Sequence, residues 1–192
     1  MRRSSASEGD GEGLVSPHAR PRRRWLRLVR NLGLLAALYL VVTHTWPRKP
    51  RIEAITFEGW QEELAARRGS IVVVPVWASW CRNCIEILPN LVELSERYRE
   101  KGVSFASLCL EEYAQQEEIE AAEEIVKRYD ARFPHFLPQQ DVAASLDAMA
   151  LEDLPAVLVY DQAGELRYRL TGVPSSNELD MADVEDAIDS LL

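Results

Sequence analysis

The stretch that decides the fold reads WASWCRNC and covers residues 77–84, with Pro89 five residues beyond the second cysteine. An apolar run over 71–76 precedes it, and a helical pattern of apolar residues over 85–98 follows it. Two thiols separated by two residues at the start of a helix can close a disulfide between neighbouring turns. The positive end of the helix also stabilises a thiolate. The pattern indicates a thiol site at a strand-to-helix junction, and a non-catalytic stapling disulfide stays open beside it.

A lone C-x-x-C can also form half of a zinc site. The chain has no second cysteine pair, and His18, His44 and His135 do not have the spacing of metal ligands. We therefore expect no metal.

The charge is divided unevenly between the first 51 residues and the rest of the chain. Residues 1–51 carry 11 Arg and Lys against 3 Asp and Glu, whereas residues 52–192 carry 11 against 28. The net charge of −9 thus combines a head of +8 with a body of −17. An acidic body argues against nucleic acid as its partner. The basic head is explained by the apolar segment that follows it.

The residues between Trp25 and Trp46 predict a membrane anchor. Residues 32–46 contain no charged side chain, and the extended segment 25–46 exceeds the roughly 20 residues that a bilayer core needs. Six Arg between residues 20 and 30 precede the apolar run, and three Arg or Lys between 48 and 51 follow it, which predicts a single pass with a cytoplasmic N-terminus and an extracytoplasmic, periplasmic-side body. The expected organisation is a disordered basic tail over 1–24, a transmembrane signal-anchor over 25–46, a linker over 47–51 and a folded domain over 52–192.

Other interpretations of this segment stay open. A cleaved secretory signal has a similar charged and apolar region, but 43–47 lacks the small-x-small cleavage pattern. Residues 22–27 loosely resemble a twin-arginine export signal. A buried core helix is the third alternative, which the basic cluster and the paired Trp residues disfavour.

Periodicity in the body predicts strands alternating with helices. The β-branched run 71–77 is typical of a central parallel strand, although Pro75 removes a ladder donor there. The charged residues of 111–132 are expected to form the solvated face of a helix. Helices are predicted over 57–68, 81–101, 111–132, 142–149 and 178–192, and strands or extended segments over 71–77, 103–110, 133–137, 155–160 and 165–171. This order predicts an α/β fold with a mixed sheet flanked by helices.

The body resembles the thioredoxin superfamily, and most of all the membrane-anchored, extracytoplasmic thiol–disulfide oxidoreductases of the TlpA/ResA type. The resemblance rests on the motif at 77–84, on Pro89, on the L-P-A at 154–156 with the strand and turn after it, and on the inserted helical segment 111–150. It implies a thioredoxin-like fold with a mixed central sheet, an inserted helical segment and an N-terminal transmembrane helix.

The resemblance also implies roles for individual residues. Cys81 is the exposed nucleophile and Cys84 the resolving thiol, which attacks the mixed disulfide and releases the partner. Arg82 is expected to favour the Cys81 thiolate by its charge, and Pro155 is expected to be cis and to face the cysteines. Trp80, Arg82, Asn83, Leu154 and Pro155 are the predicted substrate-binding and site-shaping residues.

For partners, the resemblance implies exported protein thiols and disulfides, with electrons supplied by a membrane thiol-reductant transporter. It implies a mainly reducing role, as in cytochrome c maturation, and no cofactor. The chain lacks the P-x-x-x-T-x-x-C pattern of a peroxidase and the C-x-x-x-C of copper-delivery relatives.

The chain departs from the family at positions that matter for turnover. Asn83 stands where many relatives carry Pro, and Pro75 and Ile87 stand where relatives keep a buried acid. Glu86 is a neighbouring acid, but a solvated surface role is expected for it. A tethered, non-catalytic thioredoxin-like binding module with a structural disulfide therefore stays open as the alternative. Cys109, in an apolar strand, is expected to be a buried, inert thiol.

Overall fold

The computed structural model describes residues 51–172 and 178–192. The predicted tail, the predicted signal-anchor and all but the last residue of the predicted linker lie outside the described residues. Within the described ranges, no helix is both long enough and apolar enough to cross a bilayer.

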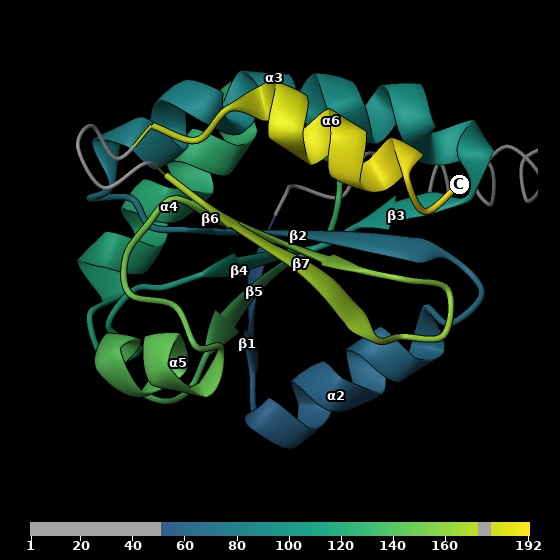
Figure 1. Ribbon diagram of the computed structural model, residues 1–192. Coiled ribbons are helices and arrows are strands. Elements are labelled where there is room, and N and C mark those ends of the chain that lie inside the picture. Colours follow the sequence, from purple (N-terminus) through teal and green to yellow (C-terminus); the bar gives the residue numbers. More distant parts are fainter. Residues whose placement is uncertain (1–50, 173–177) are drawn as a thin grey trace, which may run out of the picture. The chain divides into compact units, whose positions relative to one another are not determined.

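Seven strands form one mixed sheet in the order β1-β5-β4-β2-β6-β7, with β3 also pairing with β2 (Figure 1). Parallel pairing joins β1 to β5, β5 to β4, and both β4 and β3 to β2, whereas β6 pairs antiparallel with β2 and with β7. The strands are β1 (Ile52–Ile55), β2 (Ile71–Trp77), β3 (Val103–Phe105), β4 (Ser107–Cys109), β5 (His135–Pro138), β6 (Ala156–Tyr160) and β7 (Leu166–Thr171).

Helices cover both faces of this sheet. Helices α3 and α6 contact each other over one face, and α2 and α5 lie against the other (Figure 1). The helices are α2 (Phe57–Ala66), α3 (Arg82–Tyr98), α4 (Gln116–Arg128), α5 (Val142–Ala148) and α6 (Met181–Asp189), with a 3-10 turn η1 (Arg99–Lys101) after α3. The predicted α/β architecture with a mixed, helix-flanked sheet is confirmed.

Local sequence signals set several of the helix ends. Thr56 caps α2 by accepting a hydrogen bond from the N–H of Gly59 at 3.1 Å. Asp141 caps α5 in the same way. After α2, Gly69 adopts φ +93°, and after η1, Gly102 adopts φ +80°, where glycine carries no steric penalty.

Strand β2 is the centre of the core. All its residues are buried, and from Ile71 to Val74 they alternate between two hydrophobic clusters. Val72, Val74 and Val76 face the cluster that contains α2 and α4, whereas Ile71 and Val73 face the cluster of α6 and the distal part of α3. The burial on both faces explains the uninterrupted apolar run in the sequence.

Two strand predictions need correction. β1 was not predicted, because four residues with one apolar side chain at each end give little periodicity. The single strand expected over 103–110 is divided into β3 and β4 by a break at Ala106, whose N–H still bonds the Val73 carbonyl at 3.1 Å. Pro75 remains inside β2, paired with Val157, and the break in the neighbouring strand lies beside it.

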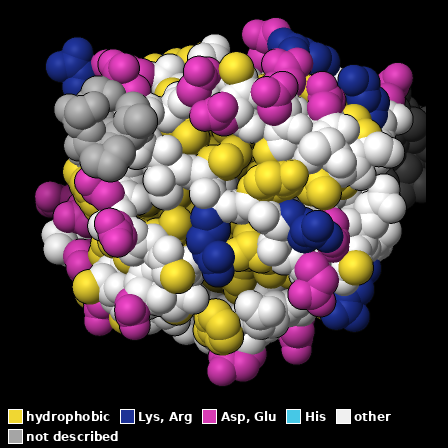
Figure 2. All heavy atoms as spheres, viewed as in Figure 1, with side chains coloured by type: hydrophobic (Ala, Val, Ile, Leu, Met, Phe, Trp, Pro, Cys, Tyr) yellow, Lys and Arg dark blue, Asp and Glu magenta, His cyan; other side chains and the backbone are white. Residues whose placement is uncertain are grey.

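The helix expected over 111–132 is shorter than predicted, because α4 begins at Gln116. The Leu110 N–H donates to the Trp77 carbonyl at 2.8 Å, which holds the chain beside β2 as far as this residue. Glu111 then turns inward and is 1% exposed. The predicted solvated acidic face is therefore wrong for Glu111. Acidic side chains are otherwise widespread on the visible surface (Figure 2).

Candidate redox-active disulfide site

Cys81 and Cys84 form a disulfide at the start of α3, with their Cα atoms 5.3 Å apart. Cys81 is the N-cap residue, and its Sγ accepts a hydrogen bond from the Cys84 N–H at 3.2 Å. This contact brings the positive helix end directly to one sulfur. Cys81 is 8% exposed and Cys84 1%, so the prediction of an exposed Cys81 is wrong for the disulfide form. Cys81 is nevertheless the more accessible sulfur, because Cys84 packs deeper in the core cluster.

The local backbone explains how the strand delivers the cysteines. β2 ends at Trp77, and the Cys81 N–H closes a tight turn by donating to the Ala78 carbonyl at 3.2 Å. The Cys81 carbonyl then accepts the first bond of the helix from Ile85 at 3.2 Å. Pro89 lies inside α3 and has no N–H to donate to the preceding turn.

The predicted site-shaping residues of the motif differ in exposure. Trp80 is 55% exposed, which is unusual for so large an apolar side chain and suits contact with a partner chain. Arg82 is an exposed side chain that forms an ion pair with Glu86 at 2.9 Å. The expected help from Arg82 to the thiolate is therefore shared with a carboxylate and screened by water. Asn83 borders a hollow of about 400 Å³, whose other lining residues are Glu86, Ile87, Glu178, Leu179 and Asp180.

The sheet brings the second predicted segment to the same edge. Val76 pairs with Ala156, so Pro155 comes beside the end of β2, where the motif begins. Leu154 and Pro155 are buried, and the peptide bond between them is cis, as the resemblance implied. Topology thus unites 77–84 with 154–155, although some 70 residues separate them in the chain.

No carboxylate occupies the two positions where relatives keep an acid. Pro75 lies in mid-strand and Ile87 packs against the cluster of α3 and α6. Glu86 is exposed and paired with Arg82, as expected for a solvated residue. An acid for this site must come from elsewhere in the fold.

A buried hydrogen-bonded chain extends from the motif across three strands. The Trp77 Nε1–H donates to Ser107 Oγ at 3.2 Å, and Ser107 Oγ lies 2.6 Å from His135 Nδ1. His135 Nε2 lies 3.1 Å from the Ala131 carbonyl, which can only accept, so we assign the proton to Nε2 and the Ser107 hydroxyl proton to the bond with Nδ1. Burial lowers the pKa of His135 from 6.5 to about 4, which keeps the ring neutral.

A second buried polar group, the Glu111 carboxylate, contacts the motif at Ser79, two positions after Trp77. Glu111 Oε1 accepts a hydrogen bond from the Ser79 N–H and lies 3.5 Å from Cys109 Sγ. Glu111 Oε2 is buried without a hydrogen-bond partner. Burial raises the pKa of Glu111, against the lowering effect of the Ser79 hydrogen bond. Burial, followed by the nearby Glu111 charge, raises the pKa of Cys109, as expected for a buried and inert thiol.

Sequence reasoning missed both buried groups. It considered His135 only as a metal ligand and placed Glu111 on a solvated helix face. Glu111 directly follows an apolar strand, and polar residues at the carboxyl ends of neighbouring parallel strands meet at one sheet edge. That position was the available signal.

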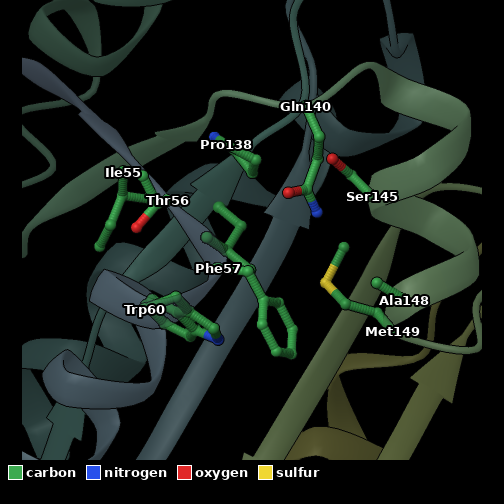
Figure 3. A pocket seen from close by; sticks show the side chains of 10 residues that line it. Ile55, Thr56, Phe57, Trp60, Pro138, Gln140, Ser145, Ala148 and Met149 are labelled. Atoms are coloured by element: carbon green, nitrogen blue, oxygen red, sulfur yellow. The ribbon is translucent and has the colours of Figure 1, made fainter.

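The structure has a second hollow, lined by residues of β1, α2, β4, β5 and α5 (Figure 3). None of its lining residues belongs to 77–84, and its volume of about 30 Å³ suits water better than a substrate. Ser145 points its partnerless Oγ toward this space. In the part of the chain that the structure describes, no three His, Cys, Asp or Glu side chains gather as metal ligands.

The sequence model of the AhpC/TSA family matches residues 48–169, which is more than half of the chain. The chain belongs to the AhpC/TSA family. The chain is also similar to the thiol-disulfide oxidoreductase ResA of Bacillus cereus. The two are 28% identical over 131 residues, which cover 68% of this chain and 72% of that protein. ResA of Geobacillus kaustophilus is 25% identical over 165 residues, covering 81% and 91% of the two chains. The likeness to the ResA type is confirmed.

Solved structures place this AhpC/TSA chain in the thioredoxin-like fold. A thiol-disulfide isomerase of Corynebacterium glutamicum matches with a TM-score of 0.54 and 20% identity, over 69% of this chain and 84% of that one. A secreted disulfide oxidoreductase of Mycobacterium tuberculosis, homologous to E. coli DsbE, matches with a TM-score of 0.52 and 17% identity, over 66% and 86%. At these identities the matches establish the fold.

Proposed function

We propose that this AhpC/TSA protein is a thiol–disulfide oxidoreductase that exchanges its Cys81–Cys84 pair with the cysteines of other proteins. The observation that carries the proposal is the disulfide at the N-terminus of α3, with the less deeply buried sulfur as the cap. The name of the ResA relatives, thiol-disulfide oxidoreductase, supports the same activity.

The chemistry follows from the position of the two sulfurs. In the reduced protein, the Cys81 thiolate attacks a partner disulfide, forming one S–S bond and releasing the other partner sulfur as a thiolate, which takes a proton. Cys84 loses its proton and attacks Cys81 Sγ, so the mixed disulfide breaks and the partner leaves with both cysteines reduced. Two electrons pass to the partner, and the Cys81–Cys84 disulfide remains. The reverse sequence oxidises a partner dithiol.

Neighbouring residues supply a surface for the partner chain. The exposed Trp80 offers an apolar contact beside Cys81, and the hollow next to Asn83 gives room for a segment that flanks the partner cysteine. Pro155 reaches the same edge through the pairing of β6 with β2. We assign substrate contact to Trp80 and Asn83, and the shaping of the site to the buried Leu154 and Pro155.

A redox titration tests the proposed activity. The full-length protein, equilibrated with glutathione buffers, should show one reversible two-electron couple. Cys84→Ser should accumulate a mixed disulfide through Cys81, because the resolving thiol is gone. Cys109→Ala is the matched control and should keep the couple, since its thiol is fully buried. A pair that cannot be reduced reversibly, with no trapped mixed disulfide, would favour the non-catalytic binding module.

The compartment and direction are finer parts of the proposal. Residues 25–46 anchor the chain with its body outside the cytoplasm, and the pair acts mainly as a reductant, supplied by a membrane thiol transporter. The Arg-rich flank of the apolar segment and the likeness to ResA support this assignment.

Thiol labelling in intact cells tests the finer proposal. A membrane-impermeant maleimide should label Cys81 in Cys84→Ser without cell lysis. Rapid acid quenching followed by alkylation should find the wild-type pair mostly reduced. Labelling that requires lysis contradicts the topology, and a mostly oxidised pair contradicts the reducing direction.

A further inference from the structure

Glu111 stands out as the buried carboxylate of the described residues. It is 1% exposed, Oε1 faces the Ser79 N–H and Cys109 Sγ, and Oε2 has no partner. None of the ion pairs within 51–172 and 178–192 includes it. A buried carboxylate without a cation and with one open oxygen destabilises a fold, so its presence calls for a functional explanation.

The position of Glu111 ties it to the disulfide. Its hydrogen bond fixes Ser79, two residues before Cys81, and the next residue back, Ala78, holds the Cys81 N–H. The Leu110 N–H, which bonds the Trp77 carbonyl, locks the Glu111 backbone against the end of β2. The carboxyl group therefore supports the turn from which the Cys81–Cys84 helix begins.

Exchange at this disulfide also moves protons. Reduction adds two electrons and two protons to the Cys81–Cys84 pair, and each thiol must lose its proton before it attacks. The positions where relatives keep an acid hold Pro75 and Ile87, and Glu86 is solvated. Among the acids of the described residues, Glu111 is the one that is buried and also hydrogen-bonded to the motif, through Ser79.

We propose that Glu111 is the positioning acid of the Cys81–Cys84 site: it holds the turn before Cys81 through Ser79, and its change of charge sets how readily the disulfide is reduced. This inference rests on the proposed thiol–disulfide exchange. When Glu111 is ionised, its negative charge disfavours a neighbouring thiolate and so the reduced form. When Glu111 is protonated, that effect disappears.

The groups that act on Glu111 come from three elements besides its own segment. Cys109 at the end of β4 and the Ser79 N–H after β2 bond the carboxylate, and Glu118 of α4 repels it. Burial is the largest influence and raises its pKa, which brings its ionisation closer to the working range of thiols.

The test compares reduction potentials across pH. Wild type, Glu111→Gln and Glu112→Gln are equilibrated with glutathione buffers from about pH 5 to pH 9, the range in which carboxyl and thiol groups exchange protons. In Glu111→Gln the equilibrium should shift toward the dithiol by about tenfold at the alkaline end, or about 30 mV, and approach wild type at the acidic end. Glu112→Gln, an exposed neighbour with the same loss of charge, should follow wild type throughout.

Each outcome decides the matter. If wild type shows no reversible couple, the proposed function fails. If the couple is present but Glu111→Gln differs by a pH-independent offset, or not at all, Glu111 is only structural and the inference is wrong. A pH-dependent difference in Glu86→Gln instead would transfer the role to Glu86.

Two further measurements test the inference even if Glu111→Gln does not fold. Glu111→Asp keeps the charge and should restore the pH-dependent part of the curve. In wild type, the reduced-minus-oxidised infrared spectrum should contain a carboxyl band that Glu112→Gln retains. Its absence from wild type would show that Glu111 does not change with the disulfide and would overturn the inference.

Discussion

Two buried polar groups adjoin the end of β2, and they are built on opposite principles. The first extends from Trp77 through Ser107 to His135 and ends on the Ala131 carbonyl, with a partner at each step. The second extends from Ser79 to Glu111, where one oxygen has donors and the other has none. Their starting points in the motif, Trp77 and Ser79, have a single residue between them.

The difference separates structural from functional polarity. A fully satisfied buried network stabilises one arrangement, because every alternative leaves a donor or acceptor unpaired. A carboxyl group with an open oxygen has two protonation states in one position, which is what redox-linked proton exchange needs. We therefore expect the His135 network to govern stability and Glu111 to govern the disulfide.

The largest expected effect is that of Cys81→Ser, which removes the Cys81–Cys84 disulfide next to the two buried polar groups. Exchange with glutathione should fall to background, because serine cannot form the mixed disulfide. In reducing buffer, the free energy of unfolding of the variant should lie within about 0.5 kcal/mol of that of reduced wild type, because both buried polar groups stay intact. Exchange assays and denaturant titrations measure the two quantities. Residual exchange through Cys84 would contradict the assignment of Cys81 as nucleophile.

The next largest effect is expected on how the free energy of unfolding depends on pH, where the His135 network and Glu111 should act differently. The pKa of His135 is about 4 in the folded protein against 6.5 ordinarily, so the unfolded chain takes up the proton first as pH falls. The stabilisation is complete above pH 6.5 and is lost toward pH 4, with a loss on the order of 3 kcal/mol. Denaturant titrations of the oxidised protein across this range measure it.

Glu111 should contribute with the opposite sign. Its pKa is raised above 4.5, so the folded state holds the proton more tightly and stability falls as pH rises through and above that value. The rise of stability with pH should therefore be steeper in Glu111→Gln than in wild type. An unchanged slope would show that Glu111 does not titrate differently in the folded and unfolded chains.

A smaller effect is expected from His135→Leu, which opens the closed network. Ser107 would lose a hydrogen-bond partner in the core, at a cost of about 2 kcal/mol near neutral pH. The difference between the Glu111→Gln and parent reduction potentials should persist in this background, since Glu111 keeps its contacts. Chemical denaturation and glutathione titration of the double variant check both statements. A lost difference would show that the two groups act together.

Cys109→Ala should have the smallest effect. It removes one buried heavy atom and the weak donor to Glu111 Oε1, so the unfolding free energy should drop by about 1 kcal/mol. The reversible couple should remain, with a slight shift in potential. Loss of the couple would contradict the prediction that Cys109 is inert.

Much of the fold could be predicted from the sequence, because the signals for its strands and helices are local. The apolar run at 71–77 indicated the central strand, and the C-x-x-C after it marked the helix start, where Cys81 is the cap. The separation of strands by helices predicted the mixed sheet. The short β1, the break at Ala106 and the late start of α4 were missed, because hydrogen bonds to distant residues decide them.

The sequence by itself determined the cysteine pair, the helix that presents it and the absence of an acid at the two expected positions, since all three depend on residue type and spacing. Only the tertiary structure decided that Pro155 reaches the same edge, that His135 completes a network with Trp77, and that Glu111 lies beside Ser79. Such neighbours come from the pairing of β2 with β4 and β6, and strand pairing joins residues regardless of their separation in the chain. Pro75 and Ile87 occupy the positions where relatives keep an acid. The acid that we propose in their place, Glu111, follows the end of β4 and is brought to the site by strand pairing.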